Sequence, residues 1–271
     1  MATRERGSLP PLLGEVIIRV MKPARSTPAE QKSHWEKTFT ESEAFFGDEP
    51  SSFARKAMAH LKEHQVRSLL EIGCGQGRDT FFLAEGGIAV TALDYSETAV
   101  TEVAQRAAKA GLAGRIRVRA HDVRERLPFA GETFDACYSH MLLCMELSTA
   151  EIAFILHETW RTLKPGGLAL YSVRSNFDKH YRTGTHLAED IYQIGGFSVH
   201  FFTESKVHQL SKGYEIMAID RMEEGSLPRD LFCVIMRKGR APESWDLDPL
   251  EEKNMSDPLD KEAPEPAPGK T

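Results

Sequence analysis

The chain has 271 residues, of which 41% are hydrophobic and 27% are charged, and its formal net charge is −6. No apolar run approaches the roughly 18 residues that a membrane-spanning helix requires, so we expect a cytoplasmic protein with no signal peptide and no membrane partner. The whole net charge lies in residues 241–271, which hold nine acidic residues and three lysines. Because the remaining body is neutral, its charge gives no reason to expect a nucleic-acid partner.

The two ends of the chain differ in composition from its middle. Several prolines interrupt residues 1–28, which we expect to form a loosely ordered segment. Residues 29–240 are expected to form one domain. The acidic, proline-rich residues 241–271 bury too little apolar surface to offset their ordering entropy, so we expect a disordered tail in which Trp245 is solvated rather than docked.

Strand and helix signals alternate between residues 68 and 120. Short apolar runs bounded by glycines or polar turns predict strands. Ser96 is expected to cap a helix that ends at Gly111. The predicted strands cover residues 68–72, 88–93 and 116–120, and the predicted helices cover 79–85 and 97–110.

The same alternation continues to residue 237. Ser148 and Glu151 form a capping box that begins a helix, and Thr203 is expected to cap a shorter helix that ends near Gly213. The predicted strands cover residues 134–139, 168–173, 215–222 and 231–237. Strands separated by helices predict an α/β fold with a doubly wound, seven-stranded, mostly parallel sheet. The short connection before the last strand predicts that this strand is antiparallel.

The four cysteines give no sign of a disulfide framework or a metal site. None of them belongs to a Cys-x-x-Cys pair, and three lie in or beside apolar, strand-like segments. This pattern is typical of small buried thiols in a reducing compartment. We therefore expect no bound metal.

The strongest functional signal is a glycine-rich turn that directly follows the strand at 68–72. Gly73, Gly75 and Gly77 alternate with other residues, and a helix follows them. Glycines allow a tight turn and let a ligand approach the backbone, while the helix N-terminus offers free N–H groups. Asp94 ends the next strand, 21 residues after Gly73, where a carboxylate can accept hydrogen bonds from ribose hydroxyls. This order predicts a nucleotide-like ligand.

The spacing of the turn disfavours a dinucleotide. The G-x-G-x-x-G fingerprint needs a third glycine where this chain has Arg78. The glycines follow a G-x-G-x-G pattern instead, and Glu71 precedes them by two residues. A nicotinamide dehydrogenase is therefore a disfavoured alternative.

Several motifs between residues 65 and 175 resemble those of class I S-adenosylmethionine (SAM)-dependent methyltransferases. Glu71-x-Gly73-x-Gly75-x-Gly77 is similar to their first motif, and the segment 90–94 resembles the next. The segments 121–123, 127–129, 134–136 and 163–167 resemble the later motifs. The resemblance implies a Rossmann-like fold, SAM as the cofactor and methyl transfer as the activity.

The resemblance also implies a role for each cofactor-binding residue. The backbone of the glycine turn would receive the methionine moiety, and Asp94 would bind the ribose. Tyr95 would lie along the adenine, with Asp122 bonded to its amino group and Val123 adding a backbone contact. Ser139 would face the sulfonium. The implied cofactor-binding set is Glu71, Gly73, Gly75, Gly77, Asp94, Tyr95, Asp122, Val123 and Ser139.

The run from Gly75 to Asp79 resembles the tellurite-resistance and thiol methyltransferase branch of the family. That branch implies a small-molecule acceptor, a thiolate or a chalcogen anion. Its members carry a His-Arg pair before the last strand, where this chain has Pro228 and Arg229. We expect Arg229 to retain the role of positioning an anion.

The remaining catalytic candidates surround the expected acceptor position. His140 ends the strand beside the cofactor's methyl group and is the candidate general base. Tyr181 and Arg182 lie in an insertion, residues 174–200, that we expect to form a lid. Aromatic residues of the N-terminal segment, among them Trp35 and Phe39, are weaker candidates for the roof of the same site.

Other functions stay open at this point. A small-molecule N- or O-methyltransferase is the alternative to a thiol enzyme. A non-catalytic SAM-binding module, which would recruit a partner through the acidic tail, is an alternative of a different class. A trithiolate site for arsenic is a minor option, because Cys137 and Cys144 have no third cysteine beside them.

Overall fold

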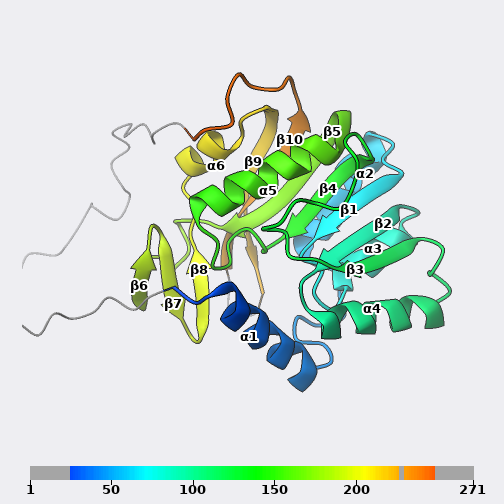
Figure 1. Cartoon of the computed structure of the whole chain (residues 1–271), viewed down its shortest axis with the longest axis horizontal. Helices are drawn as coiled ribbons and strands as arrows, with labels where there is room; N and C mark the ends of the chain where they lie inside the picture. Colours follow the sequence, from blue (N-terminus) through cyan, green and yellow to red (C-terminus); the bar gives the residue numbers. More distant parts are fainter. Residues whose placement is uncertain (1–24, 226–228, 248–271) are drawn as a thin grey trace, which may run out of the picture.

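The apolar runs of the sequence assemble into one central sheet. The computed structural model describes residues 25–225 and 229–247 (Figure 1). Within them lies a seven-stranded sheet with the order β3-β2-β1-β4-β5-β10-β9. Its strands are β1 Ser68–Ile72, β2 Ala89–Asp94, β3 Ile116–Ala120, β4 Phe134–His140, β5 Leu163–Arg174, β9 Tyr214–Glu224 and β10 Arg229–Lys238.

Strand directions follow from the connections between strands. Strands β1 to β5 run parallel to their neighbours, and crossover connections join them. Strand β10 pairs antiparallel with both β5 and β9. The predicted α/β fold, a doubly wound, seven-stranded, mostly parallel sheet with an antiparallel last strand, is confirmed.

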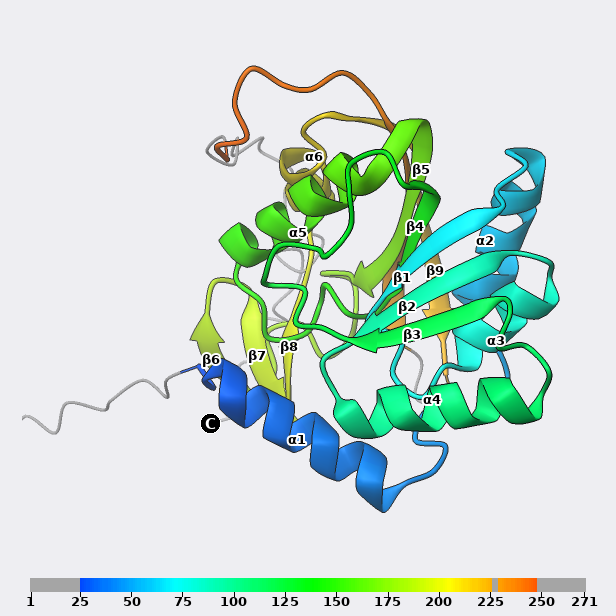
Figure 2. The same cartoon turned by 45° about the vertical axis from the view of Figure 1, so that its right-hand side comes forward.

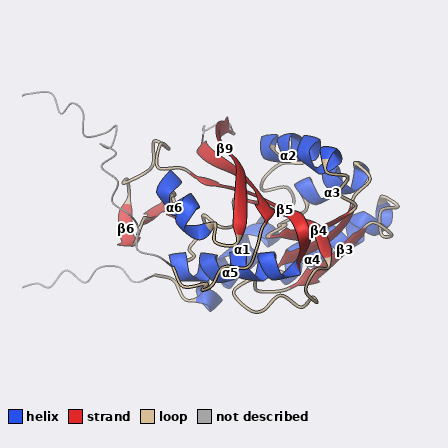
Figure 3. Ribbon diagram, turned by 90° about the horizontal axis from the view of Figure 1, so that it is seen from above, coloured by secondary structure: helices blue, strands red, loops and turns tan. Residues whose placement is uncertain are grey.

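Helices cover both faces of this sheet (Figure 3). The helices α2 Ser52–Glu63, α3 Arg78–Glu85 and α4 Glu97–Lys109 pack their apolar side chains into one core. The helices α5 Thr149–Thr162 and α6 Glu204–Leu210 pack into a second core on the opposite face. The predicted caps are present, since the side chains of Ser96, Ser148 and Thr203 each accept a hydrogen bond from a backbone N–H of the helix that follows.

Strand β5 begins five residues earlier than predicted. Leu163 already pairs with Phe134, and the ladder resumes at Leu168 opposite Ala136. The intervening Lys-Pro-Gly-Gly residues therefore form an irregularity within the strand rather than a separate turn. Gly167 is required there because a Cβ atom would lie 2.9 Å from the Asp135 carbonyl oxygen.

The insertion at 174–200 contains a second, three-stranded antiparallel sheet. Its strands are β6 Thr185–Ala188, β7 Ile191–Ile194 and β8 Phe197–His200. The sequence predicted a lid here and assigned no strands to it. The strands were missed because each is only four residues long, which leaves too few residues for a periodic pattern. Tyr181, Val199 and Phe201 form the small apolar core of this unit.

The described ends of the chain are attached to the domain. Helix α1 Pro28–Glu41 begins with a capping box formed by Thr27 and Glu30. It lies between the three-stranded sheet and α4 (Figure 2). At the other end, Trp245 stacks on His157 at 4.2 Å, so this part of the tail is docked rather than solvated as expected. The rest of the two predicted disordered segments, residues 1–24 and 248–271, lies outside the described residues.

Candidate functional site

A cavity of about 710 Å³ opens at the carboxyl ends of β1, β2 and β4. Gly73, Asp94 and His140, which follow or end these three strands, all contribute to its wall. The sheet order reverses between β1 and β4, and ligands of open α/β sheets bind at such a switch point. The volume falls within the range of small-molecule sites.

The glycine turn forms one wall of the cavity, and its backbone conformation explains the glycines. Gly73, Gly75 and Gly77 have φ values of 75°, 50° and 85°, which residues with a Cβ atom rarely adopt. A Cβ atom at Gly73 would also lie 2.8 Å from the Leu142 side chain, and one at Gly77 would lie 2.8 Å from Val103. The turn therefore presents bare backbone to the cavity.

Asp94 lies beside this turn and shapes it. Its carboxylate accepts hydrogen bonds from the backbone N–H of Gly75 at 2.8 Å and of Ser96 at 3.0 Å. Burial raises the pKa of the Asp94 carboxyl. Asp94 and Tyr95 both line the cavity, so the carboxylate is positioned for a ligand that donates hydroxyl hydrogen bonds.

Glu71 lies deeper, on β1, and is almost fully buried. The Thr80 hydroxyl donates to its carboxylate at 2.6 Å. Burial raises the pKa of Glu71 to about 8, so at neutral pH the side chain holds a proton. The cavity floor is therefore less negative than the sequence suggests.

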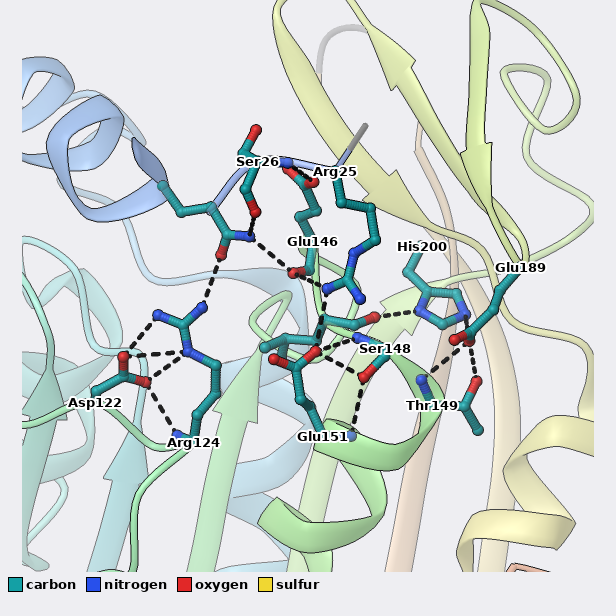
Figure 4. A network of polar contacts seen from close by, with 12 residues as sticks. Arg25, Ser26, Asp122, Arg124, Glu146, Ser148, Thr149, Glu151, Glu189 and His200 are labelled. Carbon is teal, nitrogen blue, oxygen red and sulfur yellow. Dashed lines mark hydrogen bonds and ion pairs between the residues drawn. The ribbon is translucent and has the colours of Figure 1, made fainter. Parts of the chain in front are cut away.

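Asp122 lines the cavity, but its carboxylate already has a partner. Arg124 donates to both of its oxygens, at 2.9 and 3.1 Å through Nε and at 2.6 Å through Nη2 (Figure 4). Burial raises the pKa of the Asp122 carboxyl. The hydrogen bonds from Arg124 outweigh this effect and hold that pKa below its usual value. Sequence reasoning missed Arg124, because an arginine two residues after an aspartate is not by itself a site signal.

Arg124 also joins this part of the cavity to the N-terminal segment. Its Nη1 donates to Gln31 of α1 at 3.2 Å, and the Gln31 amide donates to the carbonyl of Glu146 at 3.2 Å. Arg25 donates to the same carbonyl and to the Glu151 carboxylate at the start of α5 (Figure 4). This polar network fixes α1 over the cavity.

Aromatic side chains from α1, the loop after it and β8 line the roof of the cavity. The weaker candidates Trp35 and Phe39 do line it, together with Phe45, Phe46 and Phe197. The Trp35 ring lies 5.4 Å from that of Phe39 and 5.7 Å from that of Phe197 of the three-stranded sheet. Phe45 and Phe46 are each 40% exposed, which suits side chains at the mouth of a binding site.

The end of the cavity away from Asp94 is rich in charge. His140, Glu224 and Arg229 lie there, from the ends of β4, β9 and β10. The His140 Nδ1 atom bonds to the Ser172 hydroxyl at 2.7 Å, and burial lowers the pKa of His140 to about 4. Sequence reasoning did not select Glu224, because neighbouring acidic residues on an edge strand usually face solvent.

Three predicted site residues lie away from the cavity wall. Ser139 is buried in β4 and does not line the cavity, because successive strand residues point to opposite faces. Tyr181 packs against Phe201 and donates to Asp190 at 3.1 Å. The Arg182 guanidinium lies over the Tyr181 ring. From the same insertion the cavity wall instead receives Arg174 and His180.

Every other predicted cofactor-binding residue lines the cavity, as do His140 and Arg229. Within residues 25–225 and 229–247, no group of three or more His, Cys, Asp or Glu side chains is arranged to hold a metal ion. No helix in the same part of the chain is long and apolar enough to cross a membrane.

Comparison with known proteins finds similarity to methyltransferases over part of the chain. Residues 69–167 match the model of the methyltransferase domain. The malonyl-[acyl-carrier protein] O-methyltransferase of Erwinia pyrifoliae is 34% identical over 120 residues, which are 43% of this chain and 41% of that protein. The chain therefore matches less than half the length of this curated relative.

Solved structures share the fold over a larger part of the chain. The 1,6-didemethyltoxoflavin-N1-methyltransferase of Burkholderia thailandensis has a TM-score of 0.63 at 23% identity, covering 80% of this chain and 93% of that one. TehB from Haemophilus influenzae has a TM-score of 0.53 at 18% identity, covering 68% and 62%. At these identities the similarity shows the fold alone.

Residues 69–167 of this chain are thus similar to a methyltransferase domain, and its seven-stranded sheet has the strand order of the class I methyltransferase fold. The cavity fits SAM, because the glycine turn lines it without Cβ atoms. The Asp94 carboxylate lies in the same wall and has capacity for further hydrogen bonds, since each of its oxygens accepts one backbone N–H bond.

Proposed function

We propose that this protein transfers the methyl group of SAM to an oxygen or nitrogen atom of a small, anionic molecule. The observation that carries the proposal is that one cavity holds both the glycine turn with Asp94 and, at its other end, Arg229. A methyl transfer needs donor and acceptor in line within one enclosed site. When bound, SAM supplies the electrophilic methyl group.

The cofactor end of the cavity offers a residue for each part of SAM. The backbone of Gly73, Gly75 and Gly77 would hold the methionine moiety, with Glu71 close by. The Asp94 carboxylate would accept hydrogen bonds from the ribose hydroxyls. Tyr95, Val123 and the Asp122–Arg124 pair would hold the adenine.

Arg229 provides the reason to expect an anionic acceptor. It lines the cavity. Its backbone pairs with β9, but its side chain forms no hydrogen bond or ion pair with the residues that the structure describes. A guanidinium in this position can bind a carboxylate or phosphate in a bidentate manner. The acceptor's anionic group is therefore proposed to lie against Arg229.

The curated relative favours oxygen over sulfur as the acceptor atom, because it is named as an O-methyltransferase. The N1-methyltransferase of Burkholderia thailandensis and TehB are both similar to this chain in fold alone. The thiol or chalcogen acceptor that the motif resemblance implied therefore has weaker support than the alternative.

The test is the formation of S-adenosylhomocysteine (SAH) from SAM with panels of small carboxylates, phenols, amines and thiols. Turnover is expected with oxygen or nitrogen acceptors that carry a negative charge. The variant Asp94→Asn is expected to bind SAM about 10- to 100-fold more weakly by calorimetry, because a neutral amide replaces a charged acceptor. Glu97→Gln, on the exposed surface of α4, is the matched control. Absence of SAH with every panel, or turnover confined to thiols, would contradict the proposal.

A further inference from the structure

The Glu224 carboxylate lies in the acceptor end of the cavity, and the proposed function gives it no role. Glu224 ends β9, directly opposite Arg229 of β10 in the antiparallel ladder, and both residues line the cavity. We propose that Glu224 accepts the proton of the methyl acceptor, so that the acceptor is a small molecule with a protic N–H or O–H group as well as an anionic group. This inference rests on the proposed function.

The two oxygens of Glu224 have different surroundings. Oε1 lies 3.4 Å from the Arg78 guanidinium. Oε2 is buried and accepts no hydrogen bond from any described residue. Leaving a buried acceptor without a donor is destabilising, and native structures rarely leave one unexplained. A donor group on a bound acceptor molecule would complete the hydrogen bonding of Oε2.

His140 faces the same oxygen but is less suited to take a proton. Its Nε2 lies 3.7 Å from Oε2 of Glu224, too far for a direct hydrogen bond. Its Nδ1 is held by Ser172 at 2.7 Å, which fixes the ring. A donor atom that binds Oε2 would therefore also contact the imidazole. The role of His140 is to position this atom, while Glu224 receives its proton.

The arginines of the cavity indicate where the acceptor's anionic group and its protic reacting group would bind. Arg174 is paired with Asp178 at 2.7 Å, Arg124 with Asp122 at 2.6 Å, and Arg78 with Glu224. Among the described residues Arg229 has no such partner and can hold a separate anionic group. A reacting atom that was itself an anion would face the Glu224 carboxylate and be repelled. The reacting atom is thus expected to carry a proton.

The proposed step balances in atoms and charge. A lone pair of the acceptor's nitrogen or oxygen forms the new bond to the methyl carbon. The sulfur–methyl bond breaks, and its electron pair stays on the sulfur of SAH. The acceptor's proton passes to Oε2 of Glu224, and water takes it up after product release.

The pH dependence of this step follows from the surroundings of Glu224. Burial raises the pKa of Glu224, and the nearby Asp79 raises it further. The charges of Arg78 and Arg229 and the backbone N–H of Ser52 lower it, but burial dominates. The charged and titratable groups that face it are Arg78 and Asp79 of α3, His140 of β4 and Arg229 of β10. The acid limb of kcat is therefore expected above the ordinary range of a glutamate.

The first test is the kinetics of Glu224→Gln on an acceptor that the wild type methylates. The kcat is expected to fall about 100-fold or more, with the Kd for SAM unchanged within about twofold and the acid limb lost. Glu224→Asp should recover part of the rate. Glu223→Gln, the exposed neighbour on the same strand, is the matched control and should behave as wild type. If Glu224→Gln lowered kcat only by disturbing Arg78, the acid limb of its kcat pH profile would remain.

The second test does not require turnover. The SAH complex is titrated by calorimetry with pairs of acids that differ by one protic group: glycolate and acetate, and 4-hydroxybenzoate and benzoate. The protic member of a pair is expected to bind about 10-fold more tightly to the wild type, and Glu224→Ala should remove the preference. If the wild type discriminates neither pair, the inference is wrong.

The outcomes separate this inference from the proposed function. If SAH forms but Glu224→Gln keeps its kcat and its acid limb, Glu224 is not the proton acceptor and the methyltransferase proposal stands. Turnover confined to simple carboxylates would overturn the protic acceptor alone. If no SAH forms on any panel the proposed function fails, and the calorimetric preference still decides whether Glu224 binds a proton donor.

Discussion

Glu71 links the cofactor site to stability at the scale of a single residue. Its pKa of about 8, raised by burial, lies above the ordinary glutamate pKa of 4.5. Between these two pH values the folded protein holds a proton that the unfolded chain has lost. The stabilising contribution is therefore complete below about pH 4.5 and is lost as the pH rises toward about 8.

The variant Glu71→Gln tests this linkage. An amide cannot ionise, and its oxygen can still accept the Thr80 hydrogen bond. One linked proton changes the free energy of unfolding by about 1.4 kcal/mol per pH unit. Between pH 6 and pH 8, the free energy of unfolding of the variant is therefore expected to rise by roughly 2 kcal/mol relative to that of the wild type. Urea unfolding at both pH values measures the difference, with the exposed Glu85→Gln on α3 as control. Parallel pH dependences of wild type and variant would contradict the prediction.

At the scale of elements, the roof of the cavity depends on contacts between helices far apart in the sequence. The Glu36 carboxylate of α1 accepts hydrogen bonds from the Ser96 hydroxyl at 3.0 Å and from the backbone N–H groups of Glu97 at 2.7 Å and Thr98 at 3.2 Å. A carboxylate at a helix N-terminus satisfies free N–H groups and complements the helix dipole. Glu36 thus fastens α1 to α4.

Replacing Glu36 by alanine should release this attachment. We expect the free energy of unfolding to fall by about 1–2 kcal/mol. Amide hydrogen exchange over residues 28–41 should become about 10-fold faster. SAM should also bind more weakly, because Trp35 and Phe39 on the same helix line the cavity. Exchange mass spectrometry and calorimetry measure both effects. Glu41→Ala, an exposed residue of α1, is the control, and unchanged exchange in Glu36→Ala would show that other contacts hold the helix.

At the scale of the whole molecule, Trp245 ties the C-terminal extension to the end of the sheet remote from the cavity. Its ring lies 4.2 Å from His157 and 5.3 Å from Trp160. Trp160 in turn donates to the Gly213 carbonyl at 2.8 Å, just before β9 begins. Glu224 lies at the other end of this 11-residue strand, about 33 Å away at the usual rise.

The variant Trp245→Ala is therefore expected to affect stability without affecting the site. Loss of a half-buried aromatic side chain should lower the free energy of unfolding by about 1–3 kcal/mol, or Tm by about 2 to 12 °C for a domain of this size. The Kd for SAM should stay unchanged. Thermal melts and calorimetry give the two values, and a shift in SAM affinity would show that this end of the molecule is coupled to the cavity.

Local patterns were sufficient to predict the sheet and the cofactor end of the cavity. Residues within one strand–turn–helix–strand unit, from Glu71 to Asp94, meet because the chain connecting them is short. Glycine spacing then specified the turn, since residues with a Cβ atom rarely adopt its backbone angles. The four-residue strands β6 to β8 were missed because their pairing, not their sequence period, defines them.

Sequence by itself determined the α/β fold, the antiparallel last strand and the glycine turn with Asp94 on which the proposed SAM site rests. Only the tertiary structure decided the acceptor end. It brings together Glu224, Arg229 and His140 from β9, β10 and β4, excludes Tyr181 and Arg182 from the wall, and pairs Asp122 with Arg124 beneath α1. These residues are brought together by sheet order and by packing between distant segments, and neither leaves a period or a spacing in the sequence.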